Sequence, residues 1–192
     1  MIGRVVVLRY NEGQNTLETE RLLLRPFRLE DADAVAAFCN SEPVYRHTLS
    51  LPHPYTADCA RSWIGSHAEN FRSERGYEYA VTDKADGRLY GCVGLSHHAA
   101  HHNGELGYWF GEPHWGRGYA TEAARALIDF AFSVKGYHRV YARHFADNPA
   151  SGRVMQKCGM RFEGIQREHV LKDGAYLDVV CYAIVKQDWK GD

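Results

Sequence analysis

Between residues 105 and 124 the chain carries a glycine-rich turn that could bind a phosphate group. A predicted strand leads to Gly116 and Gly118, and an amphipathic helix starts directly after them. Glycines allow backbone conformations with positive φ and leave room for a ligand close to the main chain. Successive N–H groups can then point into one concavity at the positive end of the helix dipole, as in pyrophosphate sites, and Arg117 would add a charged donor. The pattern also suits a plain strand–helix turn, and it matches neither the Walker A nor the G-x-G-x-x-G motif.

A second group of candidate residues opens a later helix. Asn148 is a good N-cap and Pro149 suits the first helical turn, so a structural role alone would explain both. The hydroxyl of Ser151, one turn into the helix, could nevertheless reach a ligand lying across the helix start. Arg153 and Lys157 are four residues apart on one side of this helix, so they could bind phosphates or form an ordinary solvated basic face.

Apolar periodicity and turn residues predict the elements that position these two segments. Strands are expected at residues 21–27, 77–82, 88–95, 105–110, 139–144, 161–171 and 176–185, and helices at residues 30–39, 56–71, 120–134 and 149–158. Residues 40–55 contain three prolines and are expected to form a loop. This order predicts an α+β fold in which helices cover the faces of a mixed sheet.

The start of the chain stands apart from the rest. Residues 11–16 (NEGQNT) form a turn-rich break after a possible short strand at residues 5–9. We therefore expect residues 1–16 to be an N-terminal extension or an additional edge strand, and residues 17–189 to form a single domain. A chain of 192 residues fits that organisation.

Taken together, these segments resemble the GNAT superfamily of N-acetyltransferases, and within it the group of the ribosomal-protein-alanine N-acetyltransferases. The stretches that carry the resemblance are TERLLLRPF at residues 19–27, GYWFGEPHWGRGYATEA at 107–123, DNPASGRVMQKCGMRFEG at 147–164 and the hairpin at 174–178. The resemblance spans about residues 17–189. It implies the acyl-CoA N-acyltransferase fold: a mixed, mostly antiparallel seven-stranded sheet with a splay between the fourth and fifth strands, flanked by about four helices.

The resemblance also implies acetyl-CoA as cosubstrate, and no metal is expected. The residues expected around its pyrophosphate are Trp115, Gly116, Arg117, Gly118, Tyr119 and Ala120. The strand ending at Phe110 would pair with the pantetheine arm, and Asn148 and Ser151 would lie beside the arm and its thioester. Arg153 and Lys157 are counted with the cofactor-binding residues because their charges are available to phosphates.

Direct acyl transfer needs a neutral amine, a polarised carbonyl and a leaving thiolate that is neutralised. The resemblance implies that a backbone N–H at or next to Phe110 holds the thioester carbonyl. Glu105 lies close to where superfamily members carry a catalytic glutamate, and strand alternation places it on the opposite face from Tyr108. It is the candidate base, although it could also act through a water or be an ordinary solvent-facing glutamate. Ser151 matches the position of a hydroxyl near the sulfur and is the candidate acid.

The acceptor is predicted to be the N-terminal α-amine of a protein such as a ribosomal protein. A small-molecule amine (polyamine, amino acid or antibiotic) is the alternative, and a non-catalytic sensor of acyl-CoA is a third reading. The resemblance implies an acceptor groove built from about residues 44–55 and 168–178, whose mixed charge indicates no simple acidic or basic substrate. The protein is expected to act as a monomer or homodimer.

Composition argues against several other classes. A balance of 23 Lys and Arg against 24 Asp and Glu, net charge -1, does not favour nucleic-acid binding. No apolar run approaches the ~18 residues that would span a membrane. Five widely spaced cysteines without a C-x-x-C pair are typical of a reducing compartment, so a cytoplasmic location is expected. The histidines at 97, 98, 101 and 102 lack a carboxylate or cysteine at ligand spacing, and a solvated or substrate-shaping loop is favoured there over a metal site.

Overall fold

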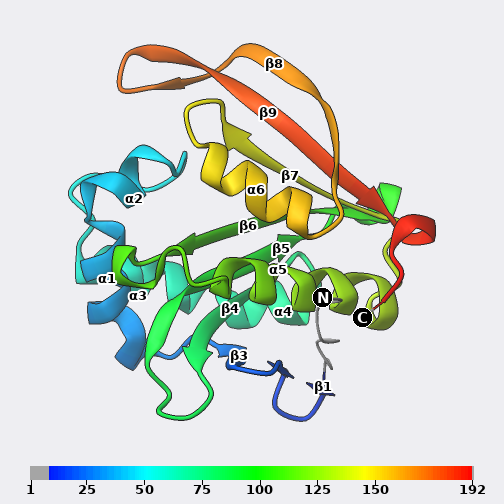
Figure 1. Ribbon diagram of the computed structural model, residues 1–192. Helices are drawn as coiled ribbons and strands as arrows, with labels where there is room; N and C mark the ends of the chain where they lie inside the picture. Colours follow the sequence, from blue (N-terminus) through cyan, green and yellow to red (C-terminus); the bar gives the residue numbers. More distant parts are fainter. Residues whose placement is uncertain (1–8, 192) are drawn as a thin grey trace.

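Nine strands form one mixed sheet in the computed structural model, which describes residues 9–191 (Figure 1). In spatial order they are β1 (Arg9–Asn11), β2 (Thr16–Glu18), β3 (Leu22–Pro26), β4 (Gly76–Asp83), β5 (Leu89–Ser96), β6 (Asn103–Phe110), β7 (Arg139–Phe145), β9 (Ala175–Val185) and β8 (Arg161–Lys172). Neighbouring strands are antiparallel except β6 and β7, which are parallel.

The helices lie on both faces of this sheet. They are α1 (Ala32–Cys39), α2 (Glu42–Arg46), α3 (Ala57–Gly65), α4 (His67–Arg72), α5 (Tyr119–Asp129) and α6 (Pro149–Lys157), and a π-helical turn (Phe130–Val134) prolongs α5. None of the helices described is long and apolar enough to cross a membrane.

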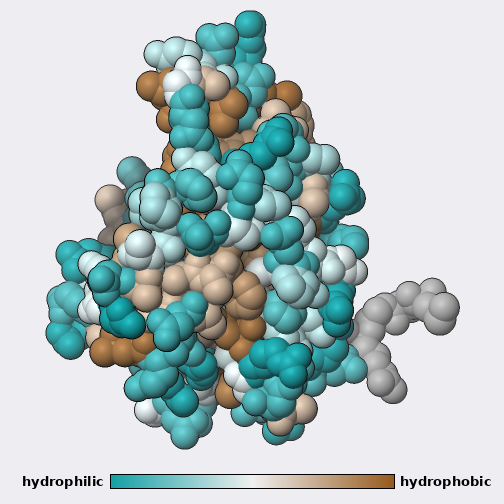
Figure 2. Space-filling view, turned by 90° about the vertical axis from the view of Figure 1, so that its left-hand side faces the viewer, coloured by the Kyte–Doolittle hydropathy of each residue, from teal (hydrophilic) through white to brown (hydrophobic). Residues whose placement is uncertain are grey.

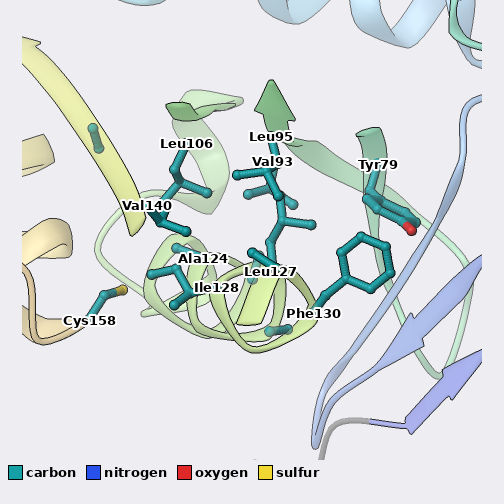
Figure 3. Packing of buried hydrophobic residues seen from close by; sticks show 14 of the residues in the cluster. Tyr79, Val93, Leu95, Leu106, Ala124, Leu127, Ile128, Phe130, Val140 and Cys158 are labelled. Atoms are coloured by element: carbon teal, nitrogen blue, oxygen red, sulfur yellow. The ribbon is translucent and has the colours of Figure 1, made fainter. Parts of the chain in front are cut away.

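The main core lies between α5 and the centre of the sheet. Leu127 and Ile128 of α5 are fully buried, and Figure 3 shows them facing Leu95, Leu106 and Val140 of three different strands. Full burial of a leucine or isoleucine side chain stabilises the fold by about 2 kcal/mol. This packing fixes the start of α5, and so the glycine turn before it, relative to the end of β6.

A second core covers the opposite face. Val35 of α1 and Ala60 and Ile64 of α3 pack against Ala80 and Cys92 of the sheet. Side chains therefore alternate between two buried layers along β4 and β5, which explains why these strands are apolar nearly throughout.

The predicted α+β fold is confirmed, with differences in count. The two strands beyond the expected seven are β1 and β2, which extend the edge beyond β3. Counted from β3, the fourth and fifth strands are β6 and β7, and the splay lies between them, as predicted. The possible strand at residues 5–9 falls almost entirely outside the described residues, in which pairing begins with Arg9 opposite Glu18.

Two helical expectations were wrong in detail. Residues 40–55 were predicted as a loop, yet they contain α2, because Ser41 caps it with its hydroxyl 3.5 Å from the Val44 N–H and Pro43 lies in its first turn, where proline is tolerated. The single helix predicted over residues 56–71 is divided at Ser66 into α3 and α4.

Candidate active site

Strands β6 and β7 part after a short stretch of parallel pairing. Their register runs only from Asn103 opposite Arg139 to Glu105 opposite Tyr141, and in Figure 1 the two strands then diverge. We call the space between residues 106–110 of β6 and residues 142–145 of β7 the gap. Backbone groups along this side of β6 have no neighbouring strand.

Hydrogen bonds to β5 show which groups of β6 face the gap. The Gly111 N–H donates to the Tyr90 carbonyl at 3.0 Å, and the Glu105 N–H donates to Ser96 Oγ at 3.0 Å. Since successive N–H groups of a strand point to opposite edges, those of Tyr108 and Phe110 point into the gap. The Phe110 carbonyl oxygen accepts a 2.6 Å hydrogen bond from Trp115 Nε1, so Trp115 ties the end of the strand to the following turn.

The glycine turn, residues 115–120, has the conformation that its sequence predicts. Gly116 has φ 73° and Gly118 has φ 83°, and a Cβ atom at Gly116 would meet nothing within 4 Å. Within the described chain, the backbone N–H groups of residues 116–121 donate to no protein acceptor. A row of free N–H groups at the start of α5 is an anion-binding arrangement.

A buried carboxylate, paired with a half-exposed arginine, supports this turn. Glu122 of α5 is 7% exposed, and its carboxylate accepts hydrogen bonds from Thr19 Oγ1 at 2.6 Å and from Arg21 Nε at 2.7 Å. The same guanidinium donates to the Arg117 carbonyl at 3.1 Å and lies 4.7 Å from the centre of the Tyr119 ring. Thr19, Arg21 and Glu122 lie within the motifs that carry the resemblance, but sequence reasoning assigned them no role.

Stacked rings flank the turn on its other side. Tyr90 of β5 stacks on Tyr119 at 4.6 Å and lies 4.3 Å from the His114 ring. Burial lowers the pKa of His114, and the charge of Arg117 lowers it further. His114 therefore adds little positive charge to the turn at neutral pH, where Arg117 is the charged side chain.

The start of α6 faces the gap from the β7 side. Asn148 Oδ1 accepts a 3.3 Å hydrogen bond from the Ser151 N–H, so Asn148 caps the helix, which is its structural role. Ser151 Oγ lies 2.8 Å from Tyr108 Oη, and Tyr108 also donates to the Ser151 carbonyl at 2.9 Å. Arg153 and Lys157 are exposed on the same helix. Sequence reasoning missed Tyr108, because alternation with Leu106 made it resemble an ordinary core residue.

Glu105 lies on the opposite face of the sheet from Tyr108, as alternation predicts, and so also from Ser151, which Tyr108 contacts. Trp109, which shares the face of Glu105, packs near Phe38 and Trp63 of the α1 and α3 layer. Both carboxylate oxygens of Glu105 accept hydrogen bonds from Arg143 of β7, at 2.8 Å from Nε and 3.0 Å from Nη2. The pair joins β6 and β7 next to the point at which they part. Arg143 was not predicted.

The two segments expected to border the acceptor groove contact each other. Tyr45 Oη of α2 donates to Asp173 Oδ1 at 2.6 Å, and this hydrogen bond raises the pKa of Tyr45. Lys172 Nζ of the β8–β9 hairpin donates to the Thr48 carbonyl at 2.9 Å. Residues 44–55 and 168–178 are called the acceptor rim below. Figure 2 faces this end of the molecule and shows apolar surface at its top, where Figure 1 places the hairpin; Leu171 of the hairpin is 58% exposed.

The clustered histidines take part in local contacts. His97 Nδ1 lies 2.9 Å from the Glu74 carbonyl and its ring stacks on Tyr137, while His98 Nε2 lies 3.2 Å from Tyr141 Oη. Over residues 9–191, no group of three or more His, Cys, Asp or Glu side chains is arranged to hold a metal ion.

Comparison with known proteins identifies the family. Residues 21–161 match the acetyltransferase (GNAT) domain model. The N-acetyltransferase YoaA of Bacillus subtilis, called uncharacterized, is 32% identical over 171 residues, which cover 88% of this chain and 96% of YoaA. The ribosomal protein uS5-alanine N-acetyltransferase of Escherichia coli is 25% identical over 191 residues, covering 94% and 96%.

A solved structure agrees with these matches. The GNAT-family acetyltransferase of Bacillus anthracis superposes with a TM-score of 0.81 at 26% identity, covering 90% of this chain and 99% of that one. The expectation of an acetyl-CoA-dependent enzyme with this fold is confirmed. The chain belongs to the GNAT family of N-acetyltransferases.

Proposed function

We propose that this enzyme transfers the acetyl group of acetyl-CoA to the N-terminal α-amine of a protein such as a ribosomal protein. The observation that carries this proposal is the ion pair between Glu105 and Arg143, which lies where the base is expected. Similarity over nearly the whole length to the uS5-alanine N-acetyltransferase supports the same acceptor.

The ion pair matters because amines differ in how strong a base they need. An α-amine with a pKa near 8 costs about 1 kcal/mol to deprotonate at pH 7, whereas a lysine-like amine costs about 4.6 kcal/mol. The Arg143 guanidinium occupies one acceptor site on each Glu105 oxygen, so an amine or a bridging water would use the sites that remain. Glu105 therefore suits an acceptor that needs a weak base, reached directly or through a water.

On the donor side, the free N–H groups of the glycine turn would bind the pyrophosphate, with Arg117 beside it. The cofactor-binding residues that we propose are Phe110, Trp115, Gly116, Arg117, Gly118, Tyr119, Ala120, Asn148, Ser151, Arg153 and Lys157. The pantetheine arm would lie in the gap, where the Phe110 N–H would polarise the thioester carbonyl. Ser151 Oγ would donate to the departing sulfur. Holding the two reactants in near-attack geometry supplies much of the rate, about 7–11 kcal/mol in favourable cases.

A polyamine is the second candidate acceptor. Glu78 of β4 lies in register with Gly94 of β5, which in turn lies in register with Gly107 of β6. This row of residues places a second carboxylate on the same face of the sheet as Glu105, and two carboxylates on one face would suit an acceptor with two ammonium groups.

The test is thiol release from acetyl-CoA with a panel of acceptors. We expect turnover with peptides that begin with alanine or serine, and none with the same peptides carrying a blocked N-terminus. Mass spectrometry of the product locates the acetyl group. Turnover with spermidine and not with the peptides would reject the protein N-terminus in favour of the second candidate.

The roles of the two named residues need their own variants. Glu105→Gln should lower kcat for the peptide without weakening coenzyme A binding in calorimetry, and Ser151→Ala should lower kcat. Wild-type kcat in Ser151→Ala would remove that serine from the mechanism.

A further inference from the structure

Tyr108 bridges the gap at the level of the candidate acid. It projects from β6, on one side of the gap, to the first turn of α6, the helix that follows β7 on the other side. Its hydroxyl oxygen lies 2.8 Å from Ser151 Oγ and 2.9 Å from the Ser151 carbonyl oxygen. β6 and β7 do not pair at this level, so the tyrosine links two parts of the molecule that backbone hydrogen bonds leave apart.

The three oxygens can share their protons in two ways. The Ser151 carbonyl can only accept, whereas each hydroxyl donates one proton and also accepts. In the first arrangement Tyr108 donates to the carbonyl, and its own oxygen accepts the proton of Ser151 Oγ. In the second arrangement Tyr108 donates to Ser151 Oγ, which frees the serine proton to point into the gap.

We propose that Tyr108 is a positioning residue for acyl transfer: it holds Ser151 Oγ at the thioester and donates to it while Ser151 donates to the departing sulfur. This inference rests on the proposed role of Ser151. As the amine nitrogen bonds to the carbonyl carbon, the C–S bond breaks and its electron pair stays on sulfur. The amine gives its proton to Glu105 or to water, and the thiolate accepts the Ser151 hydrogen bond until it takes a proton from solvent.

The surroundings of Tyr108 fit this role. Burial raises the pKa of the phenol, which therefore remains protonated and able to donate at any pH at which the enzyme would work. A serine hydroxyl by itself is a weak partner for a thiolate, and a second donor to its oxygen strengthens the bond that it gives. Phenylalanine would fill the same volume without supplying this hydrogen bond.

The test is a double-mutant cycle with Tyr108→Phe and Ser151→Ala. Tyr108→Phe should lower kcat about tenfold, the size of one hydrogen bond, with the KM for acetyl-CoA within about twofold of wild type. In the Ser151→Ala background the same change should have no further effect on kcat, because the tyrosine acts through the serine. Equal losses in both backgrounds, or wild-type kcat in Tyr108→Phe, would overturn the inference.

Tyr182→Phe is the matched control. Tyr182 is a buried tyrosine of β9 whose hydroxyl accepts a 2.9 Å hydrogen bond from Gln156 of α6. Removing this hydroxyl therefore removes a comparable contact to α6 without affecting Ser151. Thermal unfolding should show similar shifts for Tyr108→Phe and Tyr182→Phe, and only the former should lose kcat. A parallel loss of kcat in both variants would mean that Tyr108 merely supports the helix.

The experiments distinguish a wrong assignment of the acceptor from a wrong role for Tyr108. Hydrolysis of acetyl-CoA without any amine releases the same thiol, so the cycle can be measured on that reaction if every peptide is refused. If Ser151→Ala lowers thiol release and Tyr108→Phe does not, the role of Ser151 stands and the inference about Tyr108 is wrong.

Discussion

The glycine turn and the acceptor rim border the same gap, but different kinds of contact hold them in place. The turn is held by a carboxylate that is 7% exposed and by rings stacked beside it. The rim is held by side chains at the surface, such as Tyr45 with Asp173. Buried polar contacts are costly to change, whereas exposed ones contribute little to stability. Substitutions that disturb the turn should therefore cost more stability than substitutions in the rim, whose surface can vary without loss of the fold.

The largest effect is expected from the buried support of the turn. Arg21→Met leaves the Glu122 carboxylate buried without its guanidinium partner, and this should lower the free energy of unfolding by about 3 kcal/mol. Coenzyme A affinity should fall as well, because Arg21 also holds the Arg117 carbonyl. Denaturant unfolding and calorimetry measure the two effects.

Arg61→Met is the control for that variant. Arg61 of α3 pairs with Asp58 at 2.8 Å, and both side chains are more than 50% exposed, so its loss should cost less than about 1 kcal/mol and leave coenzyme A affinity unchanged. Equal effects of the two variants would remove the contrast between buried and exposed support.

Next in size is an effect of pH on the helical layer that contains α3 and α4. His67 is buried between Phe27 and Trp63, with no hydrogen-bond partner for either ring nitrogen among the described residues, and burial lowers its pKa to about 4 from an ordinary 6.5. Between these two pKa values the unfolded chain binds a proton that the folded chain excludes. Stability should therefore fall as the pH drops below 6.5, by about 2 kcal/mol at pH 5.

His67→Phe should reduce the fall in the free energy of unfolding between pH 7 and 5, the acid limb of the stability curve, as measured by denaturant unfolding. The reason is that phenylalanine keeps the aromatic packing and cannot be protonated. His101→Gln, at an exposed position, should leave the limb unchanged. An unaltered limb in His67→Phe would assign the acid sensitivity to other groups.

Two glycines with nearly identical φ angles allow backbone strain to be separated from ligand binding. Gly116 in the turn has φ 73° and Gly87 in the β4–β5 connection has φ 74°, and neither has an atom within 4 Å of an added Cβ. Alanine at either position should cost about 1 kcal/mol of stability. Only Gly116→Ala should lower coenzyme A affinity, by about tenfold, because its added Cβ would enter the open space in which the pyrophosphate would lie. Loss of affinity in Gly87→Ala would show that strain alone is responsible.

The sequence predicted the parts of the site that depend on local patterns. Glycine spacing located the turn, and strand alternation placed Glu105 and Tyr108 on opposite faces. It did not predict that Arg21 pairs with Glu122, since about 100 residues separate them, or that Tyr108 reaches Ser151, since alternation assigns a face but no partner. The prolines of residues 40–55 indicated a loop, although Pro43 occupies the first turn of α2, where it is compatible with a helix.

The smallest effect is expected at the acceptor rim. Tyr45→Phe removes the hydrogen bond to Asp173 and keeps the ring, over which Lys172 Nζ lies at 3.7 Å from the centroid. The hairpin should sample more positions, so the KM for the peptide acceptor should rise about threefold while kcat and coenzyme A affinity stay unchanged. Tyr176→Phe is the control, because Tyr176 is 66% exposed on the same hairpin and its hydroxyl makes no hydrogen bond within residues 9–191. If Tyr45→Phe instead weakened coenzyme A binding, the rim and the turn would be coupled, and the two sides of the gap could not vary independently.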